Sequence, residues 1–249
     1  MRGNVNKSVA RVVLAAAVAA TLGTATACED SKDEKPAGKG SQKPAVTEAH
    51  KPLDKAGLEQ ATLAEADVKA KGYAIKEMSK AELAEGGSAK ADKAACQPAV
   101  ALLGTKFSPE PTDSVFRTLG KGDFKTKQSF SGMLRVSAYA PGGAEATIAG
   151  LKKAVEECEG GFTATDGTGE KQKFTAVTAQ SAEKLGDEAL AFDMSGDGLK
   201  FSVKAVRSGA HVTVLMGLNM LDPMKSQVPQ ELVAAQVAKL EKAIAKNEG

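Results

Sequence analysis

The chain is poor in the residues from which stacking and catalytic sites are usually built. Its 249 residues include no Trp, two Tyr and two His, and aromatic residues make up 4% of the sequence. Large exposed rings are the usual platforms for bases and sugars, so such sites are poorly supplied here. The sequence also has no CxxC motif, no GxSxG motif and no phosphate-cradling glycine loop, and it shows no catalytic signature.

An excess of charge of one sign is also lacking. The whole chain has 33 Lys and Arg against 31 Asp and Glu. Arg2, Lys7 and Arg11 fall in an N-terminal leader without acids, and the remainder has 30 basic residues against 31 acidic ones, a net charge of −1. Without a basic stripe, the chain does not match a nucleic-acid-binding surface.

Residues 1–27 are predicted to be a signal peptide. The basic residues precede an apolar run at Val12–Leu22, which is shorter than the roughly 20 residues that a membrane-spanning helix needs. The small residues Ala25-Thr26-Ala27 follow, and Cys28 comes next. This succession of charged, apolar and small residues is typical of a cleaved export signal.

Cys28 is predicted to carry a lipid anchor. Small residues directly before a Cys resemble a bacterial lipobox, in which the Cys is acylated; Ala25 stands where the common lipobox has Leu. If Cys96 pairs with Cys158, acylation also removes an odd thiol from an oxidising compartment. The expected location is the extracytoplasmic face of the cell membrane, with the lipid bilayer as a partner. Because Ala25-x-Ala27 also suits an ordinary signal peptidase, a secreted protein with a free Cys28 is the alternative.

Residues 28–56 are predicted to be the lipidated N-terminus and a disordered tether, and residues 57–249 a single domain. The stretch from Glu29 to Ala56 is rich in charged and small residues, with six acids and six Lys. It cannot bury enough apolar surface to offset the entropy of ordering. His50 lies in this stretch and is interpreted as solvated.

The folded region is predicted to be α+β, with an antiparallel sheet of about five to six strands flanked by two or three helices. Apolar and polar residues alternate between turns, so helices are expected to cover one face of the sheet. The candidate strands are 72–78, 114–119, 130–140, 174–179, 189–194, 199–205 and 212–218, and the candidate helices are 96–103, 148–158 and 229–244.

One disulfide is expected, between Cys96 and Cys158, since pairing is the default in an exported protein. Closing a loop of about 60 residues stabilises by around 4 kcal/mol on the chain-entropy model. A redox or metal pair is disfavoured because there is no CxxC motif and neither Cys has a His near it in the sequence.

One segment resembles the start of a calcium-binding loop. Asp193, Ser195 and Asp197 alternate and Gly198 follows, as in an EF-hand. However, Lys204 stands where a bidentate Glu is required. The segment is therefore interpreted as a hairpin turn.

Met216, Met220 and Met224 recur every fourth residue near His211, and thioethers suit Cu(I). Met216 falls on a strand, where that spacing does not make one helical face, so core and loop methionines are the interpretation. His211 has no second His in the folded region with which to complete a zinc site, and it is expected to be a half-exposed residue at a strand end.

Two acidic groups are interpreted as structural. Glu156, Glu157 and Glu159 are expected to lie on a solvated face, and the pair Asp187-Glu188 at a turn. No catalytic, cofactor-binding or metal-binding residue is therefore assigned.

Six segments of the folded region follow one another in a recognisable order. They are DVKAKGYAIKEMS, AACQPAVALLG, AVEECEGGF, EKLGDEALAFDMS, VKAVRSGAHVTVL and PQELVAAQVAKLEKA. This order, with the placement of Cys96 and Cys158 and the run Leu185–Glu188, resembles actinobacterial surface lipoproteins related to the extracellular sensor domain of mycobacterial receptor Ser/Thr kinases. The resemblance covers about Leu58 to Lys246. That sensor domain has a second disulfide, for which this chain lacks the cysteines.

The resemblance implies an antiparallel sheet with flanking helices and a cleft, and ligand binding without chemistry; it transfers no ligand-contacting residue. The expected function is a membrane-anchored, non-catalytic binding or sensor-like module without a cofactor. Its ligand would be a small molecule, a lipid or a protein of the envelope, and not nucleic acid. The alternatives are a structural or chaperone-like partner in envelope assembly, which an exposed apolar patch would favour, and an envelope enzyme, which His211 beside two carboxylates would favour.

Overall fold

The computed structural model describes residues 51–123 and 128–248. The predicted signal peptide (1–27), the predicted anchor Cys28, His50 and most of the predicted tether lie outside these ranges. Within them, Leu53 is buried and the first helix begins at Lys55. Packed structure therefore starts slightly before the predicted boundary at residue 57.

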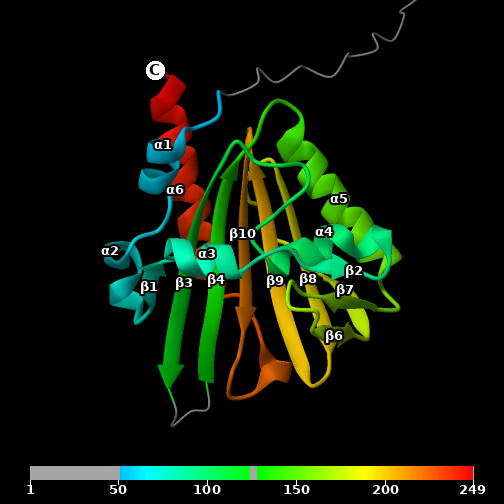
Figure 1. The fold of residues 1–249 in the computed structure, drawn as a ribbon. Helices are drawn as coiled ribbons and strands as arrows, with labels where there is room; N and C mark the ends of the chain where they lie inside the picture. The colour runs from blue at the N-terminus through cyan, green and yellow to red at the C-terminus, as the bar shows by residue number, and fades with distance from the viewer. Residues whose placement is uncertain (1–50, 124–127, 249) are drawn as a thin grey trace, which may run out of the picture. The chain divides into compact units, whose positions relative to one another are not determined.

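A seven-stranded antiparallel sheet forms the centre of the described residues (Figure 1). All neighbouring strands in it are antiparallel. This confirms the predicted α+β class with an antiparallel sheet. In spatial order the strands are β1 (Ala74–Glu77), β3 (Asp113–Asp123), β4 (Gln128–Ala138), β10 (His211–Leu218), β9 (Leu199–Ser208), β8 (Glu188–Gly196) and β7 (Ala176–Gln180).

Helices pack on both faces of this sheet and enclose two cores. The α6-side core lies under α1, α2 and α6, and the α5-side core lies under α4 and α5. The α-helices are α1 (Lys55–Ala61), α2 (Glu65–Val68), α3 (Lys80–Glu85), α4 (Gln97–Val100), α5 (Gly143–Glu157) and α6 (Gln230–Glu248). Four 3-10 turns accompany them in the described ranges, η1 (Lys69–Lys71), η2 (Ala94–Cys96), η3 (Ala101–Leu103) and η4 (Pro223–Lys225).

The expectation that helices cover only one face of the sheet is therefore wrong, and β4 shows why. Leu134 and Val136 are buried in the α6-side core, as their alternation predicts. Arg135, Ser137 and the following Tyr139 point to the opposite face and are also buried, at 1%, 0% and 0% exposure. Their polar groups made this second buried face look solvated in the sequence.

A second sheet, of three strands, is a further difference from the prediction. The predicted strand 174–179 is divided at Thr175, so its first residue belongs to the small sheet and the rest to the large one. Two glycines permit this crossing of the backbone. A Cβ atom on Gly196 would lie 2.0 Å from the carbonyl oxygen of Lys173, and one on Gly161 would lie 2.2 Å from that of Phe174. The small sheet consists of β2 (Lys90–Ala91), β5 (Phe162–Thr165) and β6 (Lys171–Phe174).

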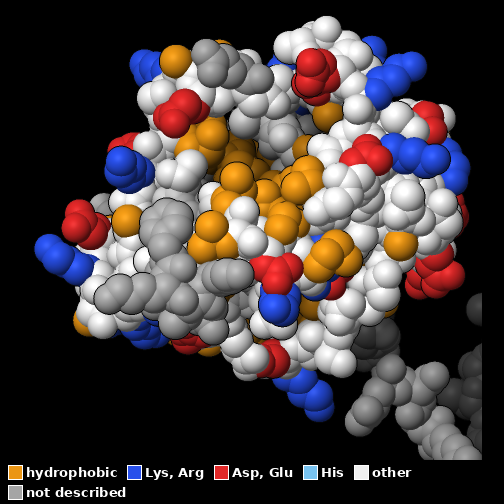
Figure 2. Space-filling model, turned by 90° about the horizontal axis from the view of Figure 1, so that it is seen from below, with side chains coloured by type: hydrophobic (Ala, Val, Ile, Leu, Met, Phe, Trp, Pro, Cys, Tyr) orange, Lys and Arg blue, Asp and Glu red, His pale blue; other side chains and the backbone are white. Residues whose placement is uncertain are grey.

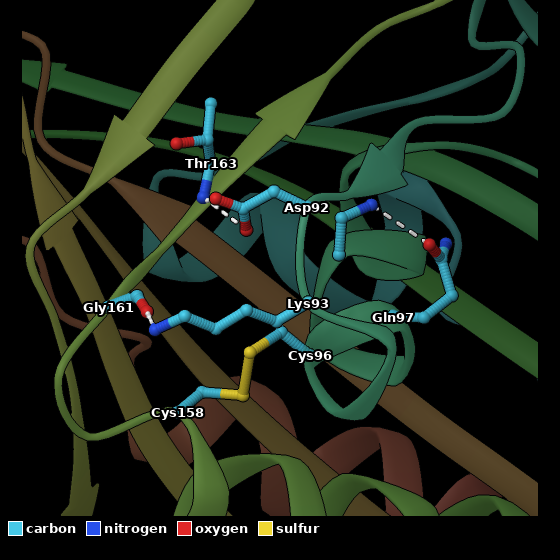
Figure 3. The surroundings of a disulfide bond; sticks show 8 residues. Asp92, Lys93, Cys96, Gln97, Cys158, Gly161 and Thr163 are labelled. Carbon is cyan, nitrogen blue, oxygen red and sulfur yellow. Dashed lines mark hydrogen bonds between the residues drawn. A yellow bond between two sulfur atoms is a disulfide. The ribbon is translucent and has the colours of Figure 1, made fainter. Parts of the chain in front are cut away.

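The predicted disulfide is confirmed. Cys96 and Cys158 are buried in the α5-side core with their Cα atoms 5.9 Å apart (Figure 3). The bond joins the segment before α4 to the C-terminal end of α5. Hydrogen bonds reinforce this junction, from Lys93 Nζ to the Gly161 carbonyl (2.6 Å), from the Thr163 N–H to Asp92 Oδ1 (2.9 Å) and from the Ala91 N–H to Gln97 Oε1 (2.9 Å).

The predicted C-terminal helix is also present, and polar contacts attach it to the start of the described chain. Its expected stripe of Val233, Val237, Leu240 and Ile244 is buried in the α6-side core. The buried Gln236 donates to the Ala61 carbonyl at 2.9 Å and accepts from the Leu63 N–H at 2.8 Å. Lys239 donates to Asp67 at 2.7 Å, and this bond holds the pKa of the Asp67 carboxyl below its usual range.

Across the described ranges, none of the helices combines the length and the apolar character that crossing a bilayer would require.

Candidate functional site

A groove of about 740 Å³ lies between the small sheet and the large sheet. Its walls come from the end of α3 and the following loop, from η3, from the β5–β6 hairpin and from the β8–β9 turn. Figure 2 views the end of the molecule at which the β8–β9 turn lies, and it shows hydrophobic side chains gathered in a hollow there. The groove thus joins segments that are far apart in the sequence.

The floor of the groove is apolar. Leu103, Phe201 and Met216 line it, and all three are partly buried side chains packed against the α5-side core. Ala89 and Ala164 add small side chains, which leave space above the floor. The groove therefore offers an apolar surface of the kind on which ligand pockets depend.

The rim of the groove is polar, and two of its carboxylates hold turns in place. Asp166 Oδ1 accepts hydrogen bonds from the Thr168 N–H at 2.8 Å, the Thr168 hydroxyl at 2.7 Å and the Glu170 N–H at 3.0 Å. The Thr168 bond is the main cause of the lowered pKa of the Asp166 carboxyl. Asp197 accepts from the Lys173 N–H at 3.0 Å. These two carboxylates therefore fix the turns at the groove mouth by accepting hydrogen bonds from backbone N–H groups.

Arg135 is a buried cation without a counter-ion among the described residues. It is 1% exposed, and none of its three guanidinium nitrogens has a hydrogen-bond partner in the described part of the chain. The ring of Phe107 covers the guanidinium, whose carbon lies 3.2 Å from the ring centroid. Burial lowers the pKa of Arg135 to about 10, so the side chain remains charged at neutral pH. Such a charge is costly to bury.

Arg135 lies beside the groove floor. It pairs with Val214 of β10, and the floor residue Met216 is two positions further along that strand, so both side chains project from the same face. The hydroxyl of Tyr139 is buried on this face as well, and within the described ranges it has no hydrogen-bond partner. Sequence patterns missed this site because they placed Arg135 and Tyr139 on a solvated face. The one available signal was a single charged residue inside an otherwise uncharged strand.

The segment that resembled a calcium loop forms the β8–β9 turn, as predicted. Asp197 and Gly198 have positive φ angles of 49° and 73°, which suits a tight hairpin. Asp193 pairs with Lys200 at 3.4 Å. Within the described residues, no group of three or more His, Cys, Asp or Glu side chains is arranged to hold a metal ion.

The three methionines lie on different kinds of segment. Met216 is in β10, whereas Met220 and Met224 are 64% and 60% exposed beyond the end of that strand. His211 differs from the prediction of a half-exposed residue, since it is fully buried. Its Nε2 atom accepts from the Leu53 N–H at 2.9 Å, and its Nδ1 atom lies 3.2 Å from the Ser208 carbonyl oxygen. The histidine thus fastens the start of the described chain to β10.

The predicted acidic groups have structural surroundings. Glu156, Glu157 and Glu159 are exposed, as expected. Asp187 accepts from the Gly209 N–H at 2.7 Å and from Arg207 at 2.9 Å, which agrees with a role at a turn. Glu188 makes ion pairs with Lys152 and Arg207.

Comparison with known proteins supports the fold. No protein-family model matches the chain, and no curated protein sequence matches it. Among solved structures, the extracellular domain of PknH from Mycobacterium tuberculosis is similar, with a TM-score of 0.50 and 12% sequence identity. The match covers 80% of this chain and 100% of that domain. At this identity the likeness shows the fold alone, and that fold agrees with the resemblance drawn from the sequence motifs.

Proposed function

We propose that this protein is an extracytoplasmic lipoprotein, anchored through Cys28, whose folded region binds a small envelope ligand with an apolar part. The groove over Phe201 and Met216 is the observation that carries the proposal, because its apolar floor and polar rim are typical of ligand sites. The likeness in fold to an extracellular domain supports an extracytoplasmic module.

The groove favours binding over catalysis. Among its described lining residues there is no His, Cys, Ser or Tyr, and its ionisable groups are Asp166, Glu170, Lys171 and Asp197 on the rim. Asp166 and Asp197 are engaged by backbone N–H groups. An enzyme would have been favoured if His211 lay beside two carboxylates. Its ring nitrogens instead contact backbone groups of Leu53 and Ser208.

The orientation of the groove suits a protein held at its N-terminal side. Figure 1 shows α1 and the β8–β9 turn at opposite ends of the large sheet. The groove mouth, which includes Asp197 of that turn, therefore lies at the end away from α1. The groove mouth therefore does not share an end of the sheet with the first described helix.

The anchor is tested by metabolic labelling with a fatty acid. We expect the wild-type protein to incorporate the label and Cys28→Ser to lose it, because the thiol is the acylation site. Equal labelling of both proteins would contradict the anchor and leave the groove proposal intact.

The groove is tested with the apolar fluorescent probe N-phenyl-1-naphthylamine. Ala84→Trp places a large ring in the groove from the exposed side of α3, and we expect it to weaken probe binding about tenfold or more. Ala81→Trp is the matched control, since Ala81 is exposed on the same helix and does not line the groove. Absence of binding to the wild-type protein, or equal binding to both variants, would refute the proposal.

A chaperone-like role is the second candidate, and an exposed apolar loop favours it. Met220, Leu221 and Met224 are 64%, 38% and 60% exposed, and such side chains can hold unfolded clients. Suppression of the aggregation of reduced lysozyme, followed by light scattering, tests this role. If the protein has this role, the wild-type protein suppresses the aggregation and the double variant Met220→Ser/Met224→Ser does not.

A further inference from the structure

We infer that the ligand of the groove is an amphiphile with an anionic head, a carboxylate or a phosphate, and that Arg135 binds this head group in place of the Phe107 ring. The inference rests on the proposed function of the groove and names the chemistry of its ligand. Arg135 supplies a planar set of N–H donors that matches the oxygens of either head group.

The first support is that Arg135 differs from the other two arginines of the described ranges. Arg117 is paired with Glu59, and Arg207 is paired with Asp187 at 2.9 Å. Both are more exposed than Arg135, with 13% and 18% of their side chains accessible. The most deeply buried guanidinium is thus the one that lacks a carboxylate among the described side chains. An anion from outside the chain would supply the missing partner for this buried positive charge.

The second support is a track of side chains on one face of the sheet, which runs from the buried Arg135 to residues that line the groove. On the same face of the sheet, Met216 is diagonally next to Arg135, because Arg135 pairs with Val214. Met216 pairs with Val203 of β9, and Phe201 lies two positions further toward the β8–β9 turn. From the spacing of neighbouring strands and residues, this track is about 15 Å long. It suits a single alkyl chain of about ten carbons lying on the apolar floor.

The third support is the surroundings of the guanidinium. Phe107 is only partly buried, so its ring can be displaced by an arriving head group. Its contact with Arg135 is a cation–π interaction, which compensates only part of the desolvation of a buried charge. The Tyr139 hydroxyl, four positions further along the chain and on the same face, is a second buried polar group without a partner among the described residues.

The experiment compares ligands that share one chain and differ in the head group. Decanoate, decyl phosphate and decanol are titrated against the full folded protein by displacement of N-phenyl-1-naphthylamine. The wild-type protein is expected to bind the two anionic ligands about 10- to 100-fold more tightly than decanol, because a charge-assisted hydrogen bond adds to chain burial. Arg135→Met is expected to abolish this preference, so that the anionic ligands bind no more tightly than decanol, since Met is a flexible apolar side chain without a charge.

The outcomes separate this inference from the proposed function. If none of the three ligands binds the wild-type protein, the groove proposal itself fails. If decanoate and decanol bind equally, or if Arg135→Met weakens both by the same factor, the groove stands and the role of Arg135 is refuted. Acetate and inorganic phosphate are the controls without a chain, and tight binding of either one alone would overturn the assignment to an amphiphile.

A second variant tests the role of the Phe107 ring that covers the Arg135 guanidinium. Phe107→Ala removes the ring from the guanidinium, and we expect the preference for decanoate over decanol to increase because the head group no longer displaces a cation–π contact. An unchanged preference would show that Phe107 does not cover the anion site.

Discussion

Breaking the bond between Cys96 and Cys158 should destabilise the folded region by about 4 kcal/mol. The two residues are 62 positions apart. For a loop of this length, the chain-entropy model gives the unfolded state an entropy loss of about 14 cal/mol/K, which is about 4.3 kcal/mol at 25 °C. Single domains are stable by only about 5–15 kcal/mol, so the cross-link accounts for a large share of the stability.

Urea unfolding, followed by far-ultraviolet circular dichroism, measures this effect. Reduced wild-type protein isolates the cross-link, because both buried sulfurs remain. The variants Cys96→Ala, Cys158→Ala and Cys96→Ala/Cys158→Ala separate the loss of packing from the loss of the bond. Both single variants should lose nearly as much stability as the double variant, since either one breaks the bond. If the reduced and oxidised wild-type proteins differ by less than about 1 kcal/mol, the reasoning from loop length is wrong.

Four further substitutions, one of them a control, test other contacts. His211→Phe leaves the buried Leu53 N–H without its acceptor, so we expect a loss of about 1–3 kcal/mol and faster hydrogen exchange at that amide. Gly161→Ala should cost more than about 2 kcal/mol in chemical denaturation, because its φ angle is +78° and its Cβ would lie 2.2 Å from a carbonyl oxygen. Gly160→Ala, where a Cβ meets open space, should change stability by less than about 0.5 kcal/mol, and equal losses would contradict the steric explanation. Asp67→Asn should be less stable than wild type at pH 7. That difference should shrink as the pH falls below 3.8, the usual pKa of the carboxyl, because the folded protein lowers the pKa and the stabilisation is lost on protonation; a difference that does not depend on pH would contradict this role.

The elements built from local contacts could be predicted from the sequence. The strands β8, β9 and β10 follow one another through tight turns, where Asp197, Gly198 and Gly209 adopt positive φ angles. Short turns between alternating segments fix both the antiparallel direction and the register. The buried apolar stripe of α6 could also be predicted, because its apolar positions repeat at helical spacing.

The small sheet could not be predicted because it depends on contacts between distant segments. Nothing in the run from Phe174 to Ala179 marks a change of sheet at Thr175. The division depends on Gly161 and Gly196, whose missing side chains let the crossing backbone approach closely. A glycine in the sequence shows that another backbone segment can approach closely at that position, but it does not identify that segment.

The candidate site was missed for a related reason. Its lining extends from Ala84 to Met216, so no local motif describes it. Phe201 and Met216 have the pattern of ordinary strand residues. Arg135 was misleading, since a charge in an alternating strand usually faces water. The structure places this charge inside the protein, since Arg135 is 1% exposed and Phe107 packs over its guanidinium.

The attachment of the first described residues has a mechanical consequence for a tethered protein. Leu53 is bonded to His211 at the start of β10, and the segment that follows is bonded to Gln236 of α6. A pulling force applied ahead of Leu53 would therefore be borne first by the bond to His211 of β10 and by the contacts of the following segment with α6. The disulfide belongs to the α5-side core, across the sheet from α6, so tension in the proposed tether would reach it only after these contacts yield.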